Sequence, residues 1–99
     1  MAAFGPTIEW SRTAVDTASR ILLVEDDALL RLAASSILLD AGYEVLEAAN
    51  AREAIEVLET VPGIGLMISD IQMPGPIDGV KLAHAVRRRW PPVEMLLTS

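Results

Sequence analysis

The sequence predicts an α/β domain, a doubly wound parallel sheet with helices on both of its faces. Short apolar runs, typical of buried strands, alternate along the chain with segments whose apolar residues recur at the helical spacing. Glycine, proline, asparagine or aspartate stands at most junctions between the two kinds of segment. Strands that alternate with helices in this way require right-handed crossovers, which make the sheet parallel and place helices on both sides.

Four strands and three helices are expected in strict alternation. Asp27 can cap the helix after the first strand, Gly42 suits the C-terminal end of that helix, and Asn50 can cap the second helix. A pair of prolines stops the third helix. In chain order, the expected strands are 21–24, 43–47, 66–69 and 93–98, and the expected helices are 28 to about 41, 51–60 and 79–90.

Each expected helix has an apolar face that should turn toward the sheet. The inward residues are Leu30, Ala33, Ala34, Ile37 and Leu38 on the first helix, Ala54, Ile55 and Leu58 on the second, and Val80, Ala83, Val86 and Trp90 on the third.

Composition limits the class of protein. The chain has 99 residues, which suits one small domain, and 52% of them are hydrophobic. No apolar run approaches the roughly 20 residues that span a bilayer, and no secretory signal is evident, so we expect a cytoplasmic protein without a membrane partner. The absence of cysteine excludes disulfides and thiolate metal sites. A net charge of -6, with one basic triplet at residues 87–89, argues against nucleic-acid binding.

Residues 1–19 differ from the regular alternation that follows them. We expect a flexible N-terminal extension, since the first residues are small and turn-like. The alternative is a short helix within residues 7–19 that packs on the domain, because Ile8, Val15 and Ala18 lie near a helical spacing.

The stretch from Ile68 to Gly79, ISDIQMPGPIDG, organises the rest of the chain. An apolar strand ends at Asp70, and the prolines and glycines after it prevent a continued helix or strand. The acidic group that begins with Glu25 and Asp26 closes the first strand in the same way. Because the carboxyl ends of parallel strands meet at one edge of the sheet, we expect Glu25, Asp26 and Asp70 to lie within a few ångströms of one another.

Three carboxylates this close repel one another unless a positive group lies between them. Mg²⁺ is the natural partner, since it takes carboxylate and water oxygens in octahedral geometry. The alternative is a solvated acidic rim with no function. Beside a metal ion that neutralises phosphoryl charge, a free carboxylate oxygen can attack phosphorus, and the loop position favours Asp70 as this acceptor. Thr98, at the end of the fourth strand, could donate its hydroxyl to a phosphoryl oxygen there, or be an ordinary strand residue.

Three stretches, in this order and spacing, carry a resemblance to a known family: ILLVEDD from Ile21, DIQMPG from Asp70 with Asp78-Gly79 closing the loop, and LLTS from Leu96. From Arg20 onward the sequence resembles the receiver domain of bacterial two-component response regulators, a CheY-like domain. This resemblance implies the three-layer, flavodoxin-like form of the predicted fold. The loop after Asp70 looks one residue longer than the common pattern, which resembles a variant found among bacterial receivers.

The resemblance implies a role for each matching residue. Asp70 resembles the phosphoacceptor, and Thr98 the switch hydroxyl that turns toward the phosphoryl group. Glu25 and Asp26 resemble the acidic pair that holds Mg²⁺, Asp26 as a direct ligand and Glu25 partly through water. The backbone carbonyl of Gln72 falls where the family supplies another ligand. The implied donor is a sensor histidine kinase or a phosphotransfer protein, and the implied product is a signalling phosphoprotein, not an enzyme with an outside substrate.

The family pattern continues with a fourth helix, a fifth strand that ends in a Lys-Pro step and a fifth helix, none of which is in this sequence. The one lysine, Lys81, lies on the third helix and does not match the active-site lysine. We therefore expect an incomplete receiver domain over residues 20–99, with its fourth strand as an exposed apolar edge. Such a chain is a fragment of a longer receiver, or completes its core as a homodimer or by strand exchange, or covers its open face with residues 7–19.

Three functions follow from these observations. The leading hypothesis is a phosphoacceptor receiver domain in a phosphorelay. The missing lysine favours a phosphorylation-independent docking module, or an inactive fragment of a longer receiver. An α/β phosphatase with Asp70 as nucleophile is disfavoured, because no second aspartate lies two residues after Asp70 to act as the acid.

Overall fold

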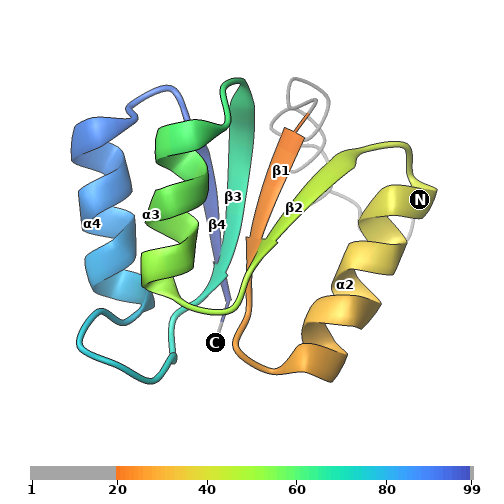
Figure 1. The fold of residues 1–99 in the computed structure, drawn as a ribbon, viewed down its shortest axis with the longest axis horizontal. Helices are drawn as coiled ribbons and strands as arrows, with labels where there is room; N and C mark the ends of the chain where they lie inside the picture. Colours follow the sequence, from red (N-terminus) through yellow and green to blue (C-terminus); the bar gives the residue numbers. More distant parts are fainter. Residues whose placement is uncertain (1–19, 99) are drawn as a thin grey trace, which may run out of the picture.

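Strands and helices alternate as predicted in the computed structural model of the chain, which describes residues 20–98 (Figure 1). The strands are β1 (Arg20–Val24), β2 (Glu44–Ala48), β3 (Ile64–Asp70) and β4 (Glu94–Thr98). The helices are α2 (Ala28–Asp40), α3 (Ala51–Thr60) and α4 (Gly79–Arg89). Strand β3 extends beyond the predicted 66–69 at both ends, and the other elements lie close to their expected positions.

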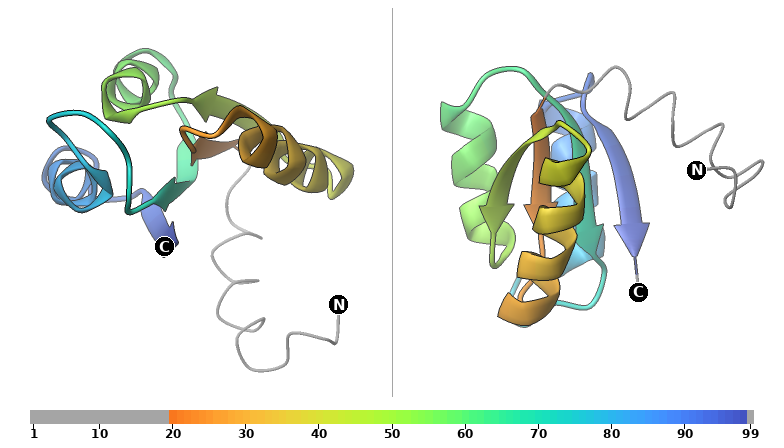
Figure 2. Two further views of the ribbon diagram at one scale, coloured as in Figure 1. Left: turned by 90° about the horizontal axis from the view of Figure 1, so that it is seen from below. Right: turned by 90° about the vertical axis from the view of Figure 1, so that its right-hand side faces the viewer.

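All four strands are parallel and lie in the order β2-β1-β3-β4. Helices α3 and α4 cover one face of the sheet and α2 lies on the other, so the molecule has three layers (Figure 2). This arrangement confirms the predicted doubly wound, flavodoxin-like class. The chain passes from β1 outward to β2 and then returns to β3 on the other side of β1. The order therefore reverses between β1 and β3, where open α/β sheets bind ligands at their carboxyl ends.

Side-chain caps fix where the helices begin. The carboxylate of Asp27 accepts hydrogen bonds from the amides of Leu29 and Leu30 at the start of α2. Asn50 and Asp78 accept from amides in the first turns of α3 and α4 in the same way. These bonds satisfy amides that have no partner inside the helix, and they confirm the predicted caps at Asp27 and Asn50.

The main core lies between the sheet and the layer formed by α3 and α4. A smaller cluster on the α2 face is centred on Ile21 and Leu66, which are fully buried. No buried side-chain nitrogen or oxygen of the described residues lacks a hydrogen-bond partner. The buried members of the main core are Leu22, Val24, Ala48, Ala51, Ala54, Leu58, Ile64, Met67, Met73, Leu82, Val86 and Val93.

The predicted inward face of α2 is only partly confirmed, because Ala34 and Leu38 are half-buried while the other three predicted residues are exposed. Leu30 is 59% exposed and Ile37 is 70% exposed, whereas Ser35 is buried and Leu38 is half-buried. Within the part of the chain that the structure describes, α2 packs mainly on β1 and β2, so only a narrow line of the helix is covered. Leucine, isoleucine and alanine surround nearly the whole helix, and such a pattern does not indicate which side turns inward.

The other two helices follow their predicted faces more closely. Ala54 and Leu58 of α3 are buried as expected. On α4, however, Val80 is 43% exposed, and the buried line runs through Leu82 and Val86. Leu82 and Val86 are four residues apart and therefore lie one above the other on the helix, while Val80 lies off this line.

The predicted N-terminal extension, and the alternative of a helix within residues 7–19, concern residues outside the described part of the chain. Among residues 20–98, no helix has both the length and the apolar character that crossing a bilayer requires.

Candidate functional site

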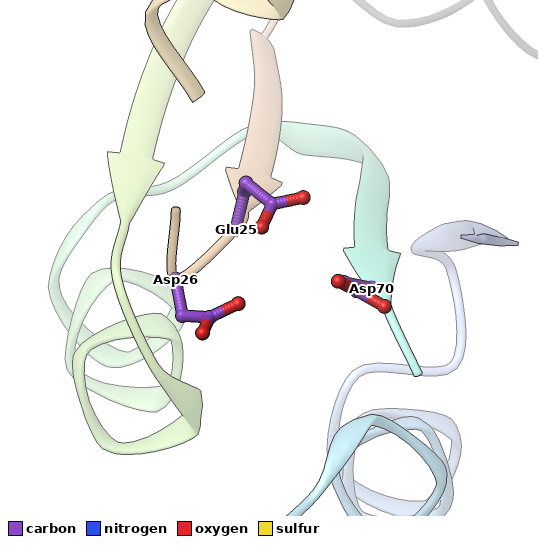
Figure 3. Close-up of side chains that lie close together, drawn as sticks. All are labelled: Glu25, Asp26 and Asp70. Carbon is purple, nitrogen blue, oxygen red and sulfur yellow. The ribbon is translucent and has the colours of Figure 1, made fainter. Parts of the chain in front are cut away.

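Three carboxylates meet where β1 and β3 end. Glu25 and Asp26 directly follow β1, and Asp70 is the last residue of β3. One carboxylate oxygen from each residue lies within 4.8 Å of the others, and Figure 3 shows the side chains of Glu25 and Asp26 turned toward Asp70. The parallel register explains why the carboxylates are close together: Val24 of β1 pairs with Ser69 of β3, so the two strands end side by side. The structure thus brings together the acidic residues that the sequence singles out.

Glu25 is held at its amide, its carbonyl and its side chain. Its amide donates to the carbonyl of Ala48 (3.0 Å), which continues the ladder between β1 and β2. Its carboxylate Oε2 accepts from the amide of Asp27 (3.0 Å), and its carbonyl accepts from the Arg31 guanidinium (2.7 Å). The turn that presents Glu25 and Asp26 is therefore fixed by backbone and side-chain bonds together.

Asp70 is oriented by the loop that follows it. Its Oδ1 accepts a hydrogen bond from the amide of Gln72 (2.9 Å). Within residues 20–98, Oδ2 of Asp70 receives no hydrogen bond, and neither does the carbonyl of Gln72. Gln72 thus lies beside the acidic cluster, as the resemblance implies, although its amide contact was not predicted.

Thr98 lies next to Asp70 on the neighbouring strand. The two residues pair in the register between β3 and β4, and the amide of Ile71 donates to the Thr98 carbonyl (2.8 Å). The Thr98 hydroxyl makes a long hydrogen bond to the carbonyl of Ser69 (3.5 Å). Thr98 is exposed at this edge of the sheet.

Gly79 packs directly against the backbone of Asp70. A Cβ atom at this position would overlap the carbonyl oxygen of Asp70 and the Cα of Ile71, so only glycine fits without a backbone shift. The Gly79 amide also donates to the Ile71 carbonyl (2.9 Å). This contact joins the start of α4 to the end of β3 and closes the loop between them.

The electrostatics of the cluster are unbalanced. Partial burial raises the pKa of the Glu25 carboxyl above its ordinary value, and the neighbouring charges of Asp70 and Asp26 raise it further. The hydrogen bond from the Asp27 amide opposes this shift. None of the ion pairs found within residues 20–98 involves Glu25, Asp26 or Asp70.

This donor set fits a hard divalent cation. Carboxylate oxygens that converge from two loops, without a cation of their own among the described residues, are ligands that Mg²⁺ prefers. Lys81 does not supply the missing charge, because its ammonium approaches the carbonyl of Pro76 (3.4 Å). The chemistry of the donors and the uncompensated negative charge therefore agree with the predicted metal.

Sequence reasoning missed the contact between Arg31 and the Glu25 carbonyl. The available signal was that Arg31 is the one charged residue within α2 before its final residue, in an otherwise apolar run. Its partner could not be inferred, since the direction of a long side chain depends on how the helix sits on the sheet.

Comparison with known sequences identifies the family. The profile of the response regulator receiver domain matches residues 21–99. Response regulator protein FleR of Pseudomonas aeruginosa is 42% identical over 82 residues, which are 83% of this chain and 17% of FleR. Sensor kinase CckA of Brucella abortus is 33% identical over 88 residues, which are 88% of this chain and 9% of CckA. The chain belongs to the response regulator receiver domain family, which confirms the resemblance.

A solved structure supports the same assignment. Response regulator TrrA of Thermotoga maritima, solved in complex with Mg²⁺-BeF, aligns with a TM-score of 0.74 and 33% sequence identity, over 80% of this chain and 67% of that chain. Receiver domains are signalling modules of two-component systems. The chain spans only a small part of the curated relatives FleR and CckA, at 17% and 9% of their lengths.

Proposed function

We propose that the chain is the phosphoacceptor receiver domain of a two-component phosphorelay, with Asp70 as the residue that receives the phosphoryl group. The observation that carries this proposal is the convergence of Glu25 and Asp26 on Asp70 at the switch point of the sheet, in a member of the receiver family. Open α/β sheets bind ligands outside the carboxyl ends of their strands, at such a switch point.

The residues present support an in-line transfer. Because the Gln72 amide engages Oδ1 of Asp70, Oδ2 is the oxygen that forms the new bond to phosphorus as the donor's bond to phosphorus breaks. The leaving group keeps the electron pair and takes a proton from water. Glu25, Asp26 and Asp70, with the Gln72 carbonyl, would hold Mg²⁺, which when bound neutralises negative charge on the phosphoryl oxygens. The Thr98 hydroxyl would leave Ser69 and donate to a phosphoryl oxygen.

The donor we infer is the phosphohistidine of a sensor histidine kinase or of a phosphotransfer protein. Response regulator FleR and sensor kinase CckA are among the relatives, so the chain resembles parts of both kinds of signalling protein. Because a kinase takes its phosphoryl group from ATP inside the cell, we also infer that the chain is located in the cytoplasm.

The test is phosphorylation of the purified chain by acetyl phosphate, with and without Mg²⁺, followed by intact mass spectrometry. We expect one added phosphoryl group that requires Mg²⁺ and is lost in Asp70→Asn. The matched control is Asp78→Asn, which changes a carboxylate in the same loop and retains the helix cap, because asparagine caps as well as aspartate. It should be phosphorylated like the unmodified chain.

A second function is favoured by one observation, the position of Lys81 away from the acidic cluster. Without a cation on the phosphoryl group, the chain would act as a docking module that binds a kinase without accepting phosphate. A folded sample that gains no mass in acetyl phosphate with Mg²⁺ would contradict phosphotransfer. Kinase binding that is unchanged by Asp70→Asn would then support the docking function.

A further inference from the structure

Arg31 links the acidic turn to both neighbouring elements. It lies on α2, and its side chain is only 21% exposed despite its charge. Its Nη1 donates to the backbone carbonyl of Glu25 (2.7 Å), and its Nε donates to the carboxylate of Glu47 on β2 (3.2 Å). One guanidinium therefore connects α2, the end of β1 and β2.

The planar geometry of the guanidinium couples its two hydrogen bonds. Arginine presents its donors in a fixed fork, so Nη1 cannot move from Glu25 without disturbing Nε at Glu47. The Arg31 amide also donates to the carbonyl of Asp27 (2.9 Å), as the fourth residue after the cap. That backbone bond would form with any residue at this position, so the side chain of Arg31 itself holds the Glu25 carbonyl, next to Asp26, and makes no hydrogen bond to Asp26 among the described residues.

We propose that Arg31 is a positioning residue for the divalent-cation site, which it serves by fixing the Glu25 carbonyl and thereby the direction of the Asp26 carboxylate. The inference rests on the proposed function, because it presumes that the acidic cluster binds Mg²⁺. Groups that orient metal ligands without touching the metal commonly change metal affinity by roughly 10–100-fold when they are removed.

Whether Mg²⁺ binding weakens or tightens when Arg31 is replaced distinguishes a positioning role of Arg31 from an effect of its charge. A cationic side chain near a cation site repels the incoming ion, so the loss of its charge alone would tighten Mg²⁺ binding. If Arg31 positions the turn, its loss weakens Mg²⁺ binding instead. A purely structural role would lower the stability of the fold and leave the affinity of the folded molecules unchanged.

The experiment is a titration of the ¹⁵N-labelled full chain with MgCl₂ at constant ionic strength, followed through the amide NMR signals of Asp26 and Asp27. The variants are Arg31→Gln and Arg31→Lys, with Arg52→Gln as the control for charge. Arg52 forms an exposed pair with Glu56 on α3, so its removal changes the net charge equally. Thermal unfolding by circular dichroism shows that each variant is folded.

We expect Arg31→Gln to weaken Mg²⁺ binding roughly tenfold or more, and Arg52→Gln to change it by less than about twofold because exposed charges are screened. If Arg31→Gln does not fold, Arg31→Lys decides, since one ammonium cannot reproduce both fork contacts and should weaken binding several-fold. Equal or tighter binding by the deciding variant would overturn the role of Arg31 and leave the metal site intact. No specific Mg²⁺ response in the unmodified chain would overturn the metal site and this inference together.

Discussion

Glu25 carries an electrostatic cost in the metal-free protein. Its carboxyl is partly buried and faces the charges of Asp70 and Asp26, and these influences raise its pKa above the ordinary value of 4.5. A carboxyl whose pKa is raised by folding opposes folding when it is ionised. This penalty is full above the raised pKa, declines as the pH falls through it, and is gone below 4.5.

Glu25→Gln should therefore raise the thermal midpoint of the metal-free chain at neutral pH. Glutamine keeps an oxygen that can accept from the Asp27 amide and removes the repelling charge. The gain should shrink as the pH falls and vanish below 4.5. Circular dichroism melts in a chelating buffer measure it, with the exposed Glu94→Gln as control. A lower midpoint for Glu25→Gln at neutral pH would contradict this account.

For individual residues, the sequence predicted which acidic side chains lie close together, but it did not predict the hydrogen bonds that orient them. Glu25, Asp26 and Asp70 could be placed together because each lies at or just after the carboxyl end of a strand in a parallel sheet. The hydrogen bonds that Gln72 and Arg31 donate could not be predicted. The first depends on the conformation of the turn after β3, and the second on the rotation of α2 about its axis.

Helix α2 depends on one residue for its start. Asp27 accepts hydrogen bonds from two amides of the first turn, and its own amide donates to Glu25. The acidic turn and the helix cap therefore share a residue, so the beginning of the helix and the presentation of the site are set together. At the other end, Ala41 is the cap and Gly42 has a φ of 99°, a conformation that suits glycine.

Asp27→Ala should destabilise the fold by about 1 kcal/mol, the usual cost of losing a side-chain cap. Asp27→Asn retains an acceptor oxygen and should restore most of this loss. Urea unfolding of the two variants, compared by their midpoints, measures the difference. Equal midpoints for Asp27→Ala and the unmodified chain would show that α2 starts without this cap.

The order and type of elements could be predicted because periodicity and turn residues are local properties of the sequence. The face of α2 could not. A helix with apolar residues on nearly every side offers no contrast, and its orientation is decided by which surfaces surround it. Leu30 and Ile37 are exposed for this reason, whereas the clear contrast between glutamate and apolar residues on α3 predicted Ala54 and Leu58 correctly.

As a whole, the described molecule is packed unequally on its two faces. The core between the sheet and α3/α4 is extensive, while the α2 face carries a small buried cluster and exposed leucines such as Leu29 (78%) and Leu39 (54%). Strand β4 pairs with β3 alone within residues 20–98 and is therefore an edge strand of the described sheet.

Of the three alternatives for the incomplete core, a homodimer predicts that the full chain dimerises through β4 at micromolar concentration, as measured by light scattering after size exclusion. Leu97→Lys, at a 39% exposed position of β4, should shift the chain toward the monomer, because charged side chains on an edge strand disfavour pairing. Leu39→Lys removes an exposed leucine of α2 and should leave the dimer intact. A monomeric unmodified chain, or dissociation by Leu39→Lys alone, would contradict this interface.

The contact between Gly79 and Ile71 has a consequence for the loop between β3 and α4. Because the hydrogen bond between them ties the two ends of the loop together, the segment between those ends forms a closed excursion from the sheet. Within it, the amide of Gln72 binds Asp70 and the side chain of Met73 is buried in the main core, so the loop is also anchored from inside. The loop therefore links the end of β3 and the start of α4 into one unit, so a change in its conformation would be felt at Asp70 and at the helix together.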